Sequence, residues 1–429
     1  MTNPTSPTGS AAPSRDDRPV WAEYPDHVEA ERFSSLQLAE DPAALYHQVR
    51  QRYGPVAPIV LDGGIPAWFV LGYRELNHVA SNPQRFARDS RRWNAWDLVP
   101  DDWSLMPYVA WTPSVMFTEG PEHKRRAAAI GDALDTLNRT ELTSVCEHVA
   151  DELVDAFAGD GEADLVAQYA HPNPARVTAK LFGLPESDIA GLVQDIFDSL
   201  DFEKETAQAY QRLYERMRHL VADRRARPRQ DIPSLLLAHP AGLTDDESVI
   251  DLLVMLAAQA PTGNWIGNTL RLMLVDDQFA VTLQGGRSSA DQALTEVLWK
   301  NTPTQNFIGR WATRSCDLGG RRVRKGDLLV LGLAAANTDP QVRPEPHESG
   351  ANRAHMSFGH GEHGCPFPAP ELAEIMARTA IEVLLDRLPD IELGVSDSEL
   401  RWRPSVWMRG LASLPVVFTP TVSRGPGTP

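Results

Sequence analysis

Apolar residues recur at helical spacing along most of the chain and alternate with polar residues only in short stretches. The helical spacing predicts long helices at 122–158, 171–183, 186–200, 204–227, 290–301 and 370–388. Strands are predicted at 56–70, as a hairpin turning at Gly63 and Gly64, at 316–332, as a pair around Gly326, and at 400–418. Residues 91–111 are irregular and unusually aromatic. We therefore expect a mainly α-helical fold with small β-sheets.

A further helix, through the 250s and 260s, has the pattern of a buried central element. Thr244 with Glu247 makes a capping-box sequence at its start. Apolar residues then cover much of its circumference: Leu252, Leu253, Leu256, Trp265, Ile266 and Leu270. Pro261 lacks a backbone N–H, so we expect this helix to kink toward Ala257.

The composition is that of one large globular unit. Of the 429 residues, 42% are hydrophobic, and no Gly/Ser-rich or Pro-rich linker interrupts the middle, which predicts a single domain over 19–420. Residues 1–18 are rich in Pro, Ser, Thr and Gly and are predicted to be a disordered tail. Residues 421–429 are predicted to be a flexible C-terminal tail.

The cysteines and the charge bear on where the protein works. The three cysteines are scattered, which argues against a disulfide framework and for a reducing cytoplasm. No apolar run approaches the roughly 20 residues of a membrane span, and no basic-then-apolar signal begins the chain. The net charge of −17 disfavours nucleic acid and anionic membranes as partners. We expect a soluble cytoplasmic protein that binds neither.

The most distinctive local sequence is FGHGEHGC at 358–365. Its glycines permit tight turns beneath a flat ligand, and Phe358 is placed to shield the sulfur of Cys365 from water. The helix that begins near Pro370 is expected to lower the pKa of the thiol through its N-terminal dipole. Two other interpretations remain open at this point: a zinc site that uses His347, His355, His360, His363 and Cys365, and a buried structural cysteine.

The same stretch resembles the cysteine loop of the cytochrome P-450 family, Phe-x-x-Gly-x-His/Arg-x-Cys, with every fixed position filled. The stretches AAANTDP and RWRPSVWMRGLASLPV extend the resemblance from about residue 20 to about 420. It implies the cytochrome P-450 fold, with haem b between the central helix and the helix after the cysteine. Cys365 would then be the ligand of the haem iron, as a thiolate that donates electron density.

The resemblance also implies which residues hold the haem. It places Phe358 and Gly359 in the ligand loop, and His355, Arg310 and His123 at the two haem propionates. Family members have an arginine four residues after His123, where this chain has Ala127. One propionate contact is therefore expected to be missing or to come from Arg125 or Arg126.

Two further departures from the family pattern concern the helices. The central helix has Ala260 and Pro261 where the family usually has an acid and a threonine that relay protons during oxygen activation. Thr262, Gln259, Asn264 or ordered water is expected to serve instead.

The helix at 290–301 has Glu296-x-x-Trp299 in place of Glu-x-x-Arg, a spelling shared by an actinobacterial subset of the family. Arg343 or Arg353 is expected to pair with Glu296, and the change is expected to replace a charge network by packed apolar surface.

The expected reaction is oxidation of an aromatic small molecule. The family pattern places these residues at the substrate: Trp93, Trp96, Ala257, Ala258, Pro261, Asn306, Phe307, Trp407 and Met408. Packing in the core is an equal alternative for the tryptophans among them. The resemblance implies that O2 and two electrons from a ferredoxin, supplied by its reductase, oxidise an indole or tryptophan-cyclodipeptide-like substrate by radical coupling. Hydroxylation of another natural product and a non-catalytic haem-binding regulator remain alternatives. Arg125 and Arg126 are expected to receive an acidic ferredoxin.

Overall fold

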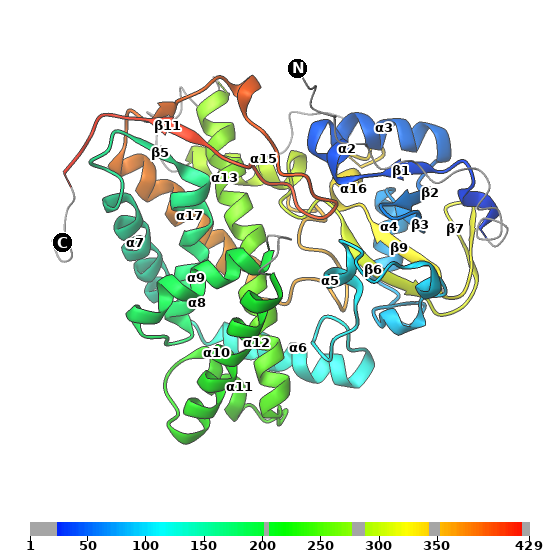
Figure 1. Cartoon of the computed structure of the whole chain (residues 1–429), viewed down its shortest axis with the longest axis horizontal. Helices are drawn as coiled ribbons and strands as arrows, with labels where there is room; N and C mark the ends of the chain where they lie inside the picture. Colours follow the sequence, from blue (N-terminus) through cyan, green and yellow to red (C-terminus); the bar gives the residue numbers. More distant parts are fainter. Residues whose placement is uncertain (1–23, 201–205, 277–287, 343–351, 423–429) are drawn as a thin grey trace, which may run out of the picture.

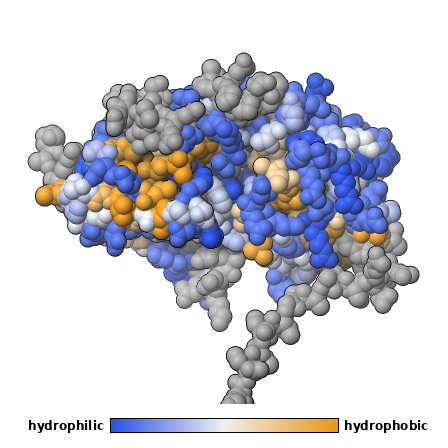
Figure 2. Space-filling model, turned by 90° about the horizontal axis from the view of Figure 1, so that it is seen from above, coloured by the Kyte–Doolittle hydropathy of each residue, from blue (hydrophilic) through white to orange (hydrophobic). Residues whose placement is uncertain are grey.

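The computed structural model describes residues 24–200, 206–276, 288–342 and 352–422. Most helices gather on one side of the molecule and the largest sheet lies on the other (Figure 1). The predicted tail 1–18 and most of the predicted tail 421–429 lie outside the described residues, and the single domain over 19–420 stays a prediction. One face of the molecule is largely hydrophilic with separate apolar patches (Figure 2).

The largest sheet has six strands in the order β1-β2-β3-β9-β6-β4. They are β1 (Glu31–Phe33), β2 (Val56–Leu61), β3 (Ile65–Val70), β9 (Leu328–Leu331), β6 (Phe307–Ala312) and β4 (Phe86–Ala87). β2 and β3 pair antiparallel from Val56↔Val70 to Leu61↔Ile65, which confirms the predicted hairpin. Gly63 and Gly64, both at positive φ, make its turn.

Two small sheets correct the other strand predictions. β7 (Cys316–Leu318) and β8 (Arg321–Val323) pair around Gly319 and Gly320, whereas the prediction put the turn at Gly326. β9 follows Gly326 and joins the large sheet instead, because its fully apolar run is buried there. Within 400–418 only β11 (Pro415–Val417) is a strand, and it lies between β10 (Glu392–Leu393) and β5 (Glu162–Asp164).

Among the described residues, five helices outside the centre follow the predicted spans: α8 (Pro172–Leu181), α9 (Glu186–Leu200), α10 (Thr206–Ala226), α15 (Ser288–Lys300) and α17 (Ala369–Arg387). Six more were not predicted: α2 (Ser35–Glu40), α3 (Pro42–Tyr53), α4 (Tyr73–Ala80), α5 (Met106–Val109), α11 (Ile232–Ala238) and α16 (Leu333–Asn337). The remaining two, α6 (Gly120–Asp135) and α7 (Arg139–Asp155), correct a prediction. The helix predicted at 122–158 is wrong as one element, since it divides into α6 and α7. The side chain of Asn138 accepts the N–H groups of Thr140 and Glu141 and so caps a new helix there.

The central helix is divided as well. α12 (Asp245–Ala257) begins with the predicted capping box of Thr244 and Glu247, and α13 (Gln259–Val275) follows after a break at Ala258. The break confirms the kink predicted from Pro261, which has no N–H to bond the carbonyl four residues earlier. The stretch 245–275 is the one candidate membrane span among the described residues, and 56% of its most apolar window is buried, as in a core helix.

Candidate active site

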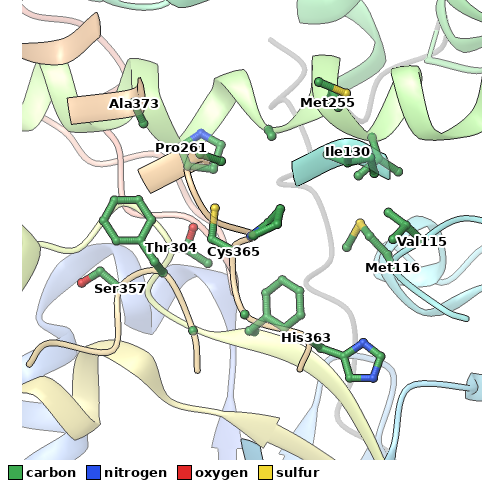
Figure 3. Close-up of a pocket in the computed structure, with 18 of the residues that line it drawn as sticks. Val115, Met116, Ile130, Met255, Pro261, Thr304, Ser357, His363, Cys365 and Ala373 are labelled. Carbon is green, nitrogen blue, oxygen red and sulfur yellow. The ribbon is translucent and has the colours of Figure 1, made fainter. Parts of the chain in front are cut away.

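A cavity of about 540 Å³ lies between the central helices and the cysteine loop. Residues of α12 and α13 form one wall, and the 357–367 loop with the first turns of α17 forms the facing wall. The side chain of Cys365 projects into this space below Pro261 (Figure 3). Residues of β6 and β9 close one end, so the cavity joins the helical and sheet halves.

The cysteine loop is a series of tight backbone turns. The N–H of Cys365 donates to the carbonyl of Phe358 at 2.8 Å, and that of Gly364 donates to Gly361 at 3.0 Å. Gly359 and Gly361 have φ of 71° and 73°. A Cβ on Gly361 would lie 2.4 Å from the carbonyl oxygen of Ala80, so this position accepts glycine alone without rearrangement.

The thiol of Cys365 is exposed to the cavity rather than packed in the core. Although the sulfur is accessible from the cavity, the protein around it desolvates the thiol and raises its pKa to about 12. The expectation of a lowered pKa is therefore wrong for the thiol as it stands. A metal cation bound to the sulfur would supply the charge that a thiolate needs. Of the residues in the zinc interpretation, His347 lies outside the described residues. The described residues contain no cluster of three or more His, Cys, Asp or Glu side chains that fits a metal, so His355, His360, His363 and Cys365 do not form such a site together.

Two buried arginines line the cavity beside the sheet. Arg310 is 2% exposed, burial lowers its pKa to about 10, and its Nε has no hydrogen-bond partner among the described residues. Arg88 is also buried, and burial together with the charge of Arg310 lowers its pKa well below the usual value. Adjacent buried cations require an anionic ligand. The two carboxylates of haem b fit this requirement, and the glycine-rich loop leaves room for a flat ring against Cys365.

Sequence reasoning missed Arg88. It follows β4 within RFARDSRRW, where nothing separates it from Arg85, Arg91 and Arg92. Only the fold shows that Arg88 is the arginine that turns inward.

The histidines of the site differ in their partners. Both nitrogens of His123 lie 2.9 Å from backbone carbonyls, those of Val115 and Glu362. His363 stacks on His123 with ring centroids 4.0 Å apart, and neither of its nitrogens has a partner among the described residues. Burial and the nearby Arg310 lower the pKa of His363 to about 2, which keeps the ring neutral. His363 was not among the predicted haem contacts, although it fills the His/Arg position of the motif.

His355 lies outside the main cavity, unlike the other predicted haem-binding residues. It lines a second pocket that also reaches Cys365. Burial, followed by the charge of Arg353, lowers its pKa to about 4. Its ring meets the indole of Trp299 edge-on, with centroids 5.8 Å apart at 88°.

Trp299 occupies the place that an arginine takes in most of the family. Its indole N–H donates to the carbonyl of Asn352 at 2.9 Å, and the side chain is fully buried. Glu296 pairs with Lys300, while Arg353 pairs with Glu374 at 3.0 Å, so the pairing expected between Arg353 and Glu296 is wrong. Arg343 lies outside the described residues.

Arg125 and Arg126 do not reach the cavity. Arg126 is fully buried and pairs with Asp251 at 2.6 Å, and Arg125 pairs with Glu247. Neither therefore replaces the propionate-binding arginine that the family has at the position of Ala127. Arg88, which lines the cavity, can bind that propionate instead. A buried Arg126 also cannot receive a ferredoxin at the surface, so that expectation is wrong for this residue.

The predicted proton-delivering residues separate into two groups. Thr262 and Gln259 line the cavity, and the amide N–H of Gln259 donates to the carbonyl of Met255 at 2.9 Å. Asn264 lies outside the cavity wall, where it hydrogen-bonds to His171. Its Oδ1 lies 2.0 Å from where a Cβ on Gly410 would be, so Asn264 packs against that glycine.

Of the predicted substrate residues, Ala258, Pro261 and Phe307 line the cavity. Outside its wall lie Trp93, Trp96, Ala257, Asn306, Trp407 and Met408. Trp93 packs on Trp96 with ring centroids 5.1 Å apart, and Trp407 packs on Tyr108 at 5.2 Å. These rings belong to the core beside the large sheet, since burial of a tryptophan there removes much apolar surface from water.

Two methionines in the cavity wall, Met116 and Met255, were not predicted (Figure 3). Both have unremarkable sequence neighbours, and no local signal marks them as ligand contacts.

Known proteins with this fold provide the comparison. No protein-family model matches the sequence. The chain is 30% identical over 393 residues to the cytochrome P-450 monooxygenase PikC of Streptomyces venezuelae, covering 88% of this chain and 91% of PikC. It is 30% identical over 392 residues to cytochrome P-450 107B1 of Saccharopolyspora erythraea, covering 88% and 95%.

A solved structure agrees with these sequence relatives. The cytochrome P-450 enzyme CxnD, described as forming a C–S bond in chuangxinmycin biosynthesis, superposes with a TM-score of 0.78 at 26% identity. The match covers 92% of this chain and 99% of CxnD. With relatives matched over nearly their whole length, and a cavity that offers one cysteine to an iron and buried cations to two carboxylates, the chain belongs to the cytochrome P-450 family of oxidoreductases and takes haem b as its cofactor.

Proposed function

We propose that the protein oxidises an apolar aromatic small molecule of the indole or tryptophan-cyclodipeptide class by coupling it to a second aromatic. The observation that carries the proposal is Pro261 in the cavity wall over Cys365, where most of the family has a proton-relaying threonine (Figure 3). The wall of the cavity is mostly apolar, and its Phe and Trp side chains are Phe182, Trp265, Phe307, Phe358 and Phe367.

Haem b with a cysteine ligand supplies O2 activation when it is bound. Coupling of two substrates R–H with O2, two protons and two electrons gives R–R and two waters. The two C–H or N–H hydrogens leave as protons and electrons, and no oxygen atom enters the product. The electrons would come from a ferredoxin and its reductase.

The residues of this chain have distinct tasks in that scheme. Cys365 would ligate the iron, and Arg88 and Arg310 would neutralise the haem carboxylates. Gln259 and Thr262 are the side chains of α13 in the wall that can hold or pass a proton. The apolar remainder of the wall excludes water and binds the flat faces of the substrates.

The proposal also includes the cellular setting. We infer that the protein acts in the cytoplasm and belongs to the subset with Glu-x-x-Trp, in secondary metabolism. Support comes from the names of its relatives, which include a monooxygenase and a bond-forming enzyme.

Hydroxylation is the second candidate, and Thr262 favours it. Thr262 lies in the cavity wall and is 7% exposed, and its hydroxyl can deliver protons for oxygen insertion. The relative PikC is named a monooxygenase.

One experiment decides between the two reactions. The purified holoprotein is titrated with tryptophan cyclodipeptides and related indoles while the Soret band is recorded, and the ligands that shift it are turned over with ferredoxin, reductase and isotopically labelled O2. Coupling gives a product of two substrates less two hydrogens without label. Hydroxylation gives one labelled oxygen per substrate. The coupling proposal fails if every product carries label or if no indole shifts the spectrum.

A further inference from the structure

A buried ion pair joins α6 to α12 next to the cavity. Arg126 donates through Nε to Oδ2 of Asp251 at 2.8 Å and through Nη2 to Oδ1 at 2.6 Å. Both side chains are fully buried, with 0% of their surface exposed. Such a bidentate pair has a fixed geometry, since the planar guanidinium meets both carboxylate oxygens.

The same two side chains also hold the loop between α5 and α6. Arg126 Nη1 donates to the carbonyl of Pro113 at 2.6 Å, and Oδ1 of Asp251 accepts the N–H of Val115 at 2.9 Å. Val115 and Met116 of this loop line the cavity (Figure 3). The ion pair therefore fixes a stretch of cavity wall, residues 113–116, to the central helix.

Two residues on the cavity side complete the support of this stretch. Arg88 Nε donates to the carbonyl of Met116 at 2.8 Å, and the Nδ1 of His123 lies 2.9 Å from the carbonyl of Val115. Both side chains also line the cavity, where the haem carboxylates are expected. Residues 113–116 thus lie between the Arg126–Asp251 pair in the core and the two side chains, Arg88 and His123, that line the cavity.

Stability alone does not explain such a pair. Removal of two charges from water costs several kcal/mol per ion, and packed apolar residues in their place are often as stable. The charged pair adds something that apolar residues cannot. It supplies one hydrogen-bond donor and one acceptor to the backbone of residues 113–116 and so fixes where that backbone lies.

We propose that Arg126 and Asp251 are positioning residues that hold the 113–116 wall and so set the width of the ligand cavity. Because Arg88 and His123 contact both this wall and the cavity, haem bound in the cavity would hold them in place and reduce the mobility of residues 113–116. This second part rests on the proposed function, because it takes haem as the group that occupies the cavity.

The test compares two aspartates, each in an ion pair with a buried arginine. Asp251→Asn removes the charge next to Arg126. The control, Asp155→Asn, removes a partner of Arg387, which is 3% exposed, between α7 and α17 and away from the cavity. The haem-loaded proteins are titrated with imidazole and with the bulky azole econazole, and the Soret band reports binding. Amide hydrogen exchange of residues 113–118 is measured with and without haem.

In the Asp251→Asn protein we expect econazole to bind about tenfold more weakly while imidazole changes by less than about twofold. The small ligand reaches the iron without filling the cavity, so the wall affects only the large one. Asp155→Asn should leave both azoles unchanged. Exchange at 113–118 should be faster in Asp251→Asn than in wild type, and faster in haem-free than in haem-loaded wild type.

Asp251→Glu keeps the charge and provides a second variant if the amide does not fold; it should recover most of the econazole affinity. Equal weakening of both azoles, an equal effect of Asp155→Asn, or unchanged exchange at 113–118 would overturn the inference. A wild-type protein whose spectrum responds to neither azole would instead contradict the haem site itself.

Discussion

His171, at the start of α8, should make the protein less stable in mild acid. The side chain is 8% exposed, and burial lowers its pKa from 6.5 to about 4. The positive charge of Arg403 lowers this pKa further, whereas the hydrogen bond to Asn264 raises it. As the pH falls below 6.5, the unfolded chain binds a proton at this histidine that the folded chain does not bind until about pH 4. Stability that is present above pH 6.5 is therefore lost between pH 6.5 and 4.

The size of the loss follows from the two pKa values. Their difference of about 2.5, at about 1.4 kcal/mol per pH unit, amounts to about 3 kcal/mol at pH 4. At pH 5 the loss is about 2 kcal/mol by the same conversion. Proteins are usually stable by about 5–15 kcal/mol, so a change of this size in the free energy of unfolding is measurable.

The measurement is the free energy of unfolding in urea at pH 7 and pH 5, followed by tryptophan fluorescence, for wild type and His171→Gln. Glutamine retains a hydrogen-bonding group for Asn264 but does not titrate. The drop from pH 7 to pH 5 should be about 2 kcal/mol smaller in the variant. His47→Gln, the same substitution at an exposed histidine, is the control. An equal drop in wild type and His171→Gln would refute the argument from burial.

Three more predictions follow, two on the haem site and one on the buried Trp299. Gly361→Ala should lower the free energy of unfolding by at least about 1–2 kcal/mol, because alanine is strained at this positive φ. It should also reduce the haem content, measured as Soret absorbance per polypeptide, because the new Cβ would lie 2.4 Å from the carbonyl oxygen of Ala80. Trp299→Ala should destabilise the protein by about 3–5 kcal/mol in urea unfolding, since it empties a fully buried site. Arg88→Gln and Arg310→Gln should each accelerate haem transfer to apomyoglobin, and an unchanged rate in either would show that this arginine does not hold a haem carboxylate.

Local sequence signals predicted the elements that depend on near neighbours. α9 spans the predicted 186–200, the hairpin turns at its two glycines, and the capping box of Thr244 and Glu247 begins α12. Each rests on contacts within a few residues, so the pattern is visible in the chain itself. The one wrong helix, 122–158, failed at Asn138, a cap that the apolar periodicity conceals.

The cysteine loop could be predicted for the same reason. Eight consecutive residues contain the ligand, the glycines that turn tightly and the aromatic cover. Pro261 likewise predicted the interruption of the central helix, because the missing N–H is a property of the residue alone.

The tertiary structure decided every feature that depends on contacts between residues far apart in the chain. Arg88 turns into the cavity and Arg126 away from it to Asp251, 125 positions further along the chain. The tryptophans of 91–111 pack into or against the core, which is one of the two roles that the sequence left open for them. The sequence determined the helices, the hairpin and a cysteine presented to a flat cofactor. Which arginine, histidine or tryptophan faces that cofactor depends on burial and charge among distant residues, and only the packed fold brings those together.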